Sequence, residues 1–169
     1  LPRPAREYMN EALERGWTYP LPARGNPPRV LITSGCNPLR RWPSPQIVEK
    51  VLWPKLKMIA IVDFRLSTTG MKADLLLPAA GYYEKMGIKY AVALAPYVVV
   101  GEQAVAPLGE SKSEWEIFSL LAKRIQERAI ERGIEGDLAK IYDEFSMEGT
   151  YGPKDEVKVV DRILQLSTV

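Results

Sequence analysis

Three short, mainly apolar runs mark the first half of the chain, and each is bounded by proline, glycine or a polar turn. They cover residues 29–33, 58–62 and 74–78. Continuous apolar runs of this length are typical of strands buried on both faces. Short helices are predicted between the runs, over residues 45–52 and 67–72. The resulting order predicts an α/β fold: a mainly parallel sheet with helices on both faces.

The second half of the chain changes to helical periodicity. Residues 89–106, rich in Val, Ala and Tyr around a central proline, first predict a pair of extended segments. Ser113 and Glu116 then form a capping box. The clearest helix follows over about 114–132, where apolar residues recur every three or four positions: Trp115, Phe118, Ala122, Ile125 and Ala129. Weaker patterns predict helices over 5–16, 137–145 and 155–166.

These elements divide the chain into three parts. A helix and a proline-rich connector occupy residues 1–28, an α/β domain occupies 29–135, and a helical extension occupies 136–169. With 169 residues, of which 46% are hydrophobic, the chain can bury a core without disulfides or metals. The start, Leu-Pro-Arg-Pro, is neither an initiator methionine nor a signal peptide, so we expect a segment of a longer polypeptide.

Composition excludes several classes of function. The 23 basic and 21 acidic residues leave a net charge of +2, too small for an electrostatic footprint on nucleic acid. The absence of histidine excludes catalytic triads, and a single cysteine, Cys36, excludes an intramolecular disulfide framework. The apolar stretches are too short to span a bilayer, so we expect no direct membrane insertion. Any chemistry must come from carboxylates, hydroxyls, amines or a bound cofactor.

A polar turn follows the first predicted strand, where doubly wound sheets place their ligands. In Gly35-Cys36-Asn37-Pro38, glycine permits a tight turn and Asn37 offers both a donor and an acceptor. Arg40 and Arg41 come next and suit a phosphate. Taken alone, such a turn more often only ends a strand, and Cys36 is more often a small buried apolar group than a metal or redox site.

Carboxylates and an amine occupy comparable positions further along. Asp63 follows the second strand and suits a ribose hydroxyl or a purine edge, but a helix cap or a partner for Arg65 is an equal alternative. Lys85 suits a ribose or phosphate oxygen. Glu114 suits the two donors of guanine, although an acid in the first turn of a helix is favoured without any ligand.

Taken together, four ordered blocks resemble the molybdopterin oxidoreductases of the dimethyl sulfoxide reductase family. The resemblance covers about residues 1–165 and is closest to the branch with the respiratory nitrate reductase, selenate reductase and ethylbenzene dehydrogenase catalytic subunits. It corresponds to a minor part of a complete catalytic subunit. The blocks are residues 35–43, residues 62–69 leading to 73–80, Tyr83-Glu84-Lys85, and residues 110–118.

The resemblance implies a domain that holds one guanine dinucleotide end of a molybdenum bis(molybdopterin guanine dinucleotide) cofactor. Many relatives carry aspartate where this chain has Glu114, so the contact either stays there or moves to Ser113. By resemblance, the residues that line the nucleotide are Asn37, Val62, Asp63, Lys85 and Glu114.

No catalytic residue and no metal ligand is assigned to this chain. By resemblance, the cysteines of the 4Fe-4S cluster, the segment that ligates molybdenum and the closing barrel belong to the rest of the subunit. The implied partners are that remainder and an iron–sulfur electron-transfer subunit. The alternative is a non-catalytic α/β remnant that acts as a binding or assembly module.

Overall fold

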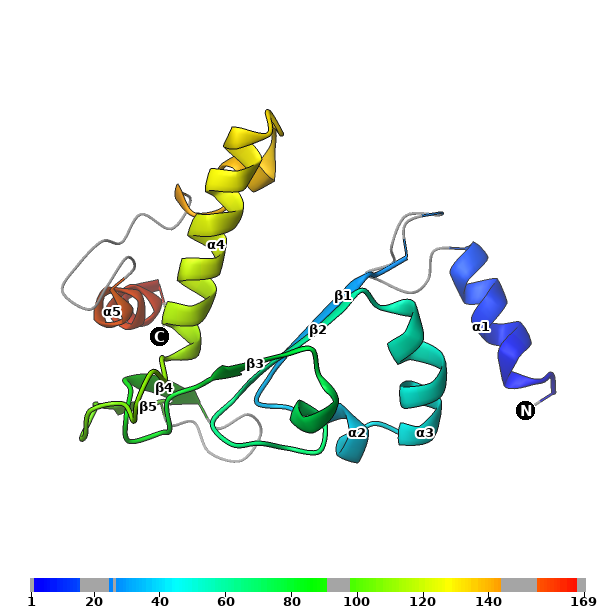
Figure 1. The fold of residues 1–169 in the computed structure, drawn as a ribbon, viewed down its shortest axis with the longest axis horizontal. Coiled ribbons are helices and arrows are strands. Elements are labelled where there is room, and N and C mark those ends of the chain that lie inside the picture. The colour runs from blue at the N-terminus through cyan, green and yellow to red at the C-terminus, as the bar shows by residue number, and fades with distance from the viewer. Residues whose placement is uncertain (1, 16–24, 26, 91–97, 144–154, 167–169) are drawn as a thin grey trace.

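The computed structural model describes residues 2–15, 25, 27–90, 98–143 and 155–166 (Figure 1). At its centre lies a three-stranded parallel sheet in the order β1-β2-β3. All three predicted strands are confirmed to within one residue, and with them the predicted α/β class. The strands are β1 (Val30–Ser34), β2 (Met58–Asp63) and β3 (Leu75–Pro78).

The register brings the carboxyl ends of the strands to one edge of the sheet. Ser34 at the end of β1 pairs with Val62, and Asp63 at the end of β2 pairs with Pro78 of β3. The turn after β1 is fixed to the same edge, because the Gly35 amide donates to the Val62 carbonyl at 3.1 Å. Loops that leave the strands therefore meet beyond Asp63.

The crossover from β1 to β2 is helical, as predicted, but it is divided into short pieces. The helix predicted over 45–52 begins at Pro45 and continues past its predicted end, because Pro54 sits at the start of a 3₁₀ turn, where its missing N–H is not needed. The pieces are α2 (Pro38–Arg41), α3 (Pro45–Ile47), the π-helical turn η1 (Val48–Leu52) and the 3₁₀ turn η2 (Trp53–Lys55).

The connection from β2 to β3 is less helical than predicted. Only the 3₁₀ turn η3 (Gly70–Lys72) forms within the helix predicted over 67–72. Side chains take the hydrogen bonds there, since the Gly70 amide donates to the Ser67 hydroxyl at 3.2 Å.

The two faces of the sheet are covered unequally. On one face Thr33 and Ile61 are buried. On the other, Val30 and Ile32 remain 47% and 39% exposed. The long helix α4 (Glu114–Glu131) covers that second face only near the carboxyl ends of the strands, where Ile117 packs against Val62. Figure 1 shows α3 and α4 on opposite sides of the strands.

The second half of the chain forms a hairpin and helices. The predicted extended pair is confirmed as antiparallel β4 (Gly87–Tyr90) and β5 (Val98–Gly101). The predicted cap of α4 is present, because the Ser113 hydroxyl accepts from the Glu116 amide at 3.0 Å. The remaining elements are α1 (Ala5–Glu14), the 3₁₀ turn η4 (Asp137–Ala139) and α5 (Glu156–Leu166).

The helix predicted over 137–145 is reduced to η4 in the described residues. Its continuation is interrupted because the Gln126 side chain of α4 accepts from the amides of Tyr142 and Asp143, at 2.9 and 3.2 Å. Most of the proline-rich connector, the last residue of the helix predicted over 5–16 and the last two residues of the helix predicted over 137–145 lie outside the described residues. No helix in the described part of the chain combines the length and apolar character needed to cross a membrane.

Candidate functional site

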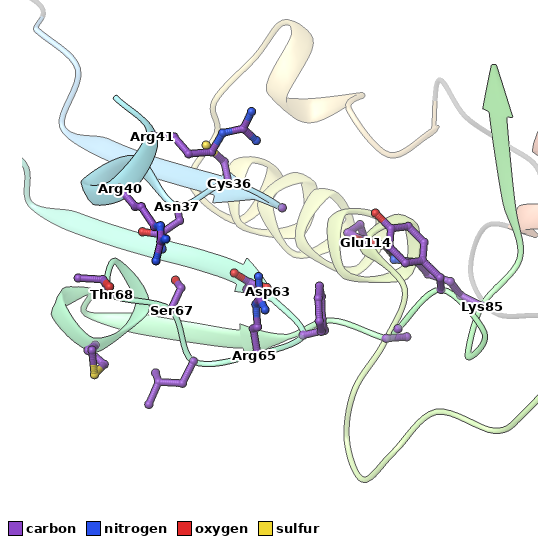
Figure 2. A pocket seen from close by; sticks show the side chains of 17 residues that line it. Cys36, Asn37, Arg40, Arg41, Asp63, Arg65, Ser67, Thr68, Lys85 and Glu114 are labelled. Atoms are coloured by element: carbon purple, nitrogen blue, oxygen red, sulfur yellow. Dashed lines mark hydrogen bonds and ion pairs between the residues drawn. The ribbon is translucent and has the colours of Figure 1, made fainter. Parts of the chain in front are cut away.

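A pocket of about 780 Å³ lies beyond the carboxyl ends of the parallel strands, within the size range of small-ligand sites (Figure 2). Loops after all three strands and the start of α4 form its walls. The lining residues come from positions 35–37, 40–41, 63–68, 71, 80–82, 85 and 114. Four of the five predicted site residues are therefore brought together from distant parts of the sequence.

The pocket carries both signs of charge. Arg40, Arg41 and Arg65 line it with no carboxylate partner among the described residues. In Figure 2, Arg40 lies with Asn37 at one end and Lys85 at the other, with Asp63 between them. Such a mixture suits a ligand that carries both anionic groups and neutral hydrogen-bond donors.

Asn37 is held from behind by a buried threonine. The Asn37 carboxamide oxygen accepts from the Thr69 hydroxyl at 2.5 Å and from the Thr69 amide at 3.3 Å. Thr69 is fully buried, and its hydroxyl also accepts from the Leu39 amide at 3.0 Å. The turn after β1, the start of α2 and the loop after β2 are thereby joined.

Asp63 ends β2 half-buried at the middle of the pocket. Its carbonyl accepts from the Ala79 amide at 3.0 Å. Its carboxylate accepts no hydrogen bond from any residue that the structure describes, and it makes neither the helix cap nor the Arg65 ion pair allowed by the sequence. The carboxylate is thus available to a ligand.

Lys85 and Glu114 pair with each other at the far end of the pocket. The ammonium group is the more enclosed partner, with a side-chain exposure of 15% against 36% for the carboxylate. It also lies 5.8 Å from the centre of the Tyr82 ring. The pair joins the loop before β4 to the first turn of α4.

Ser113 has other partners and does not line this pocket. Besides capping α4, its hydroxyl donates to the carboxylate of Glu156 on α5. Burial raises the pKa of Glu156 above its usual value; the Ser113 hydrogen bond and nearby Lys85 oppose the shift, while Glu116 and Glu114 add to it. Of the two predicted alternatives at the start of α4, only Glu114 faces the pocket.

Val62, predicted beside Asp63 in the site, has its side chain in the core instead. It is 1% exposed and packs against Ala79 and Ile117. Side chains alternate along a strand, so Val62 and Asp63 cannot face the same way. Cys36 lines the pocket half-buried rather than in the core.

A family model described as molybdopterin oxidoreductase matches residues 20–124, more than half of the chain. The chain belongs to the molybdopterin oxidoreductase family. The predicted resemblance is therefore confirmed. Every residue that lines the pocket lies within the matched region.

Relatives of this molybdopterin oxidoreductase chain include the alpha subunits of two reductases and of a dehydrogenase. It is 35% identical over 153 residues to the respiratory nitrate reductase subunit alpha of Haloferax mediterranei, covering 81% of this chain and 15% of that protein. It is 35% identical over 154 residues to the dimethylsulfide dehydrogenase subunit alpha of Rhodovulum sulfidophilum, covering 86% and 16%. For the perchlorate reductase subunit alpha of Dechloromonas aromatica, identity is 28% over 153 residues, covering 85% and 16%.

The chain thus spans about 15–16% of the length of these relatives and corresponds to a segment of such a subunit. Among its described residues, no group of three or more His, Cys, Asp or Glu side chains is placed to hold a metal ion. No motif predicted a site role for Thr69, because that role depends on a contact with Asn37 across 32 positions.

Proposed function

We propose that this chain is the segment of a molybdenum oxidoreductase catalytic subunit that binds one guanine dinucleotide end of a bis(molybdopterin guanine dinucleotide) cofactor. The observation that carries the proposal is the convergence of Asn37, Asp63, Lys85 and Glu114 on one pocket at the carboxyl edge of the sheet. Nucleotides bind at this edge in open α/β sheets.

The chemistry of the pocket fits such a ligand. Guanine presents neighbouring N–H donors, which the carboxylates of Asp63 and Glu114 would accept. The diphosphate presents anionic oxygens, which Arg40 and Arg41 would bind. Lys85 would hold Glu114 in place and neutralise it when no donor is bound.

The bound cofactor would supply oxygen-atom transfer or hydroxylation at molybdenum, and this chain would retain and orient it. We place that chemistry, the iron–sulfur cluster and the contact with an iron–sulfur electron-transfer subunit outside these residues. The open face of the sheet supports a role inside a larger subunit. Val30, Ile32 and Leu75 share this face and are 39–47% exposed, a surface that the remainder of the subunit would cover.

Asp63→Ala in the complete subunit tests the assignment. Loss of a charge-assisted hydrogen bond is worth about 1.5–3 kcal/mol, so we expect bound guanine nucleotide to dissociate at least tenfold faster. Nucleotide and molybdenum per polypeptide measure the effect after dialysis. Glu110→Gln, which removes an exposed carboxylate from the loop before α4, is the matched control. Unchanged retention in Asp63→Ala contradicts the proposal.

The alternative of a non-catalytic remnant makes a different prediction. A remnant would exist in the native organism as a 19.0 kDa protein without pterin or molybdenum. Native mass spectrometry separates the two, because the proposal predicts these residues within a much longer polypeptide that carries the cofactor.

A further inference from the structure

We infer that Thr69 is a positioning residue that makes Asn37 a hydrogen-bond donor toward a phosphate oxygen of the bound nucleotide. The inference deepens the proposed function and rests on it. The oxygen of the Asn37 carboxamide already accepts two hydrogen bonds from Thr69.

The orientation of the Asn37 amide follows from the chemistry of its neighbours. A backbone N–H can only donate, so the Asn37 atom that faces the Thr69 amide at 3.3 Å must be the oxygen. The Thr69 hydroxyl accepts from the Leu39 amide, which leaves its own proton for the same oxygen at 2.5 Å. Both contacts select one of the two amide orientations.

The amide nitrogen of Asn37 is thereby directed away from Thr69. It donates to no residue that the structure describes, while Asn37 itself lines the pocket. A side chain that offers only N–H groups needs an acceptor on the ligand. Arg40 lies at the same end of the pocket, so the acceptor best matched to both side chains is a phosphate oxygen.

This arrangement also fixes the direction of the nucleotide. The phosphates would lie at the Asn37 end, over the turn after β1, and the base would lie toward Asp63 and Glu114. Thr69 contributes without touching the ligand, because it is fully buried behind Asn37.

Four variants of the complete subunit test the inference through the rate at which guanine nucleotide is lost during dialysis. Thr69→Val keeps the shape but removes the hydroxyl, and we expect about tenfold faster loss. Thr69→Ser keeps the hydroxyl, and we expect near-normal retention. Asn37→Asp keeps the oxygen that Thr69 binds but replaces the outward N–H₂, so it should lose nucleotide as fast as Asn37→Ala.

Thr33→Val is the matched control, since the buried Thr33 hydroxyl makes no hydrogen bond to any residue that the structure describes. Retention in this variant should equal that of the unchanged subunit. If Asn37→Ala retains nucleotide normally, Asn37 is no ligand and the proposed function fails at this residue. If Asn37→Ala loses nucleotide but Asn37→Asp or Thr69→Val does not, Asn37 binds in another way and this inference alone is overturned.

Discussion

The two ends of the pocket are built on different physical principles. At one end, neutral groups buried behind the pocket wall hold Asn37 through Thr69. At the other, Lys85 and Glu114 form an ion pair that remains partly open to solvent. Buried hydrogen bonds depend on geometry and little on salt, whereas an exposed pair is weak and is screened. The first end is suited to fixing orientation and the second to adjusting charge.

The largest effect at the ion-pair end is expected from Lys85→Met. It leaves Glu114 without the cation that pairs with it, while Glu116 keeps its own partner Lys112, so we expect nucleotide to dissociate up to about fivefold faster at low salt. Dissociation is measured at about 0.1 M and 0.5 M NaCl, across which charge screening increases. Higher salt should shrink the effect of Lys85→Met but leave that of Asn37→Ala unchanged.

Lys85→Arg is the matched variant for this prediction and should preserve most of the retention. Equal salt dependence for Lys85→Met and Asn37→Ala would contradict the contrast between the two ends.

A smaller, local effect is expected from Ser113→Ala. Loss of a helix cap costs about 1 kcal/mol, so amides in the first turn of α4 should exchange hydrogen about fivefold faster in the complete subunit. Ser119→Ala, at a buried serine inside α4, is the control and should leave that turn unchanged. Normal exchange in Ser113→Ala would show that the start of the helix does not depend on the cap.

The smallest effect concerns Glu156. Its pKa is raised in the folded protein, so the folded state holds the proton more tightly than the unfolded state. Stability from this group is present below the ordinary carboxyl pKa of 4.5 and is lost as pH rises toward the raised value. Protection of α5 amides should therefore fall over that interval, measured by hydrogen exchange with correction for intrinsic rates.

Glu156→Gln should remove this dependence, because the neutral amide still accepts from Ser113. The charged groups that act on the Glu156 carboxylate are Glu116, Glu114 and Lys85. Asp161→Asn, at an exposed position of α5, is the control for a general loss of negative charge. If the protection of α5 amides falls by the same amount in Glu156→Gln, another carboxylate causes the pH dependence.

The sequence predicted the strands and α4 because each depends on local information. Apolar runs between breakers identify β1–β3, and the capping pattern at Ser113 and Glu116 identifies the start of α4. The short connections were harder to predict. Side chains such as Gln126 and Ser67 accept hydrogen bonds from backbone amides that would otherwise donate within a helix.

The candidate site shows the same difference between features that local sequence predicts and features that depend on tertiary contacts. The ordered motifs predicted Asn37, Asp63, Lys85 and Glu114, and all four line the pocket. Val62 does not line the pocket, because its side chain faces the core, and the motif alone carries no information about which way a strand residue faces. The Thr69 contact could not be predicted, because it depends on tertiary packing between two loops.

An experimental structure of the complete subunit with its cofactor would test the proposed nucleotide site directly. We expect a guanine nucleotide in this pocket, with carboxylates of Asp63 and Glu114 at the base and Asn37 at the phosphates. A pocket filled by protein side chains from the rest of the subunit, with both guanines bound elsewhere, would contradict it.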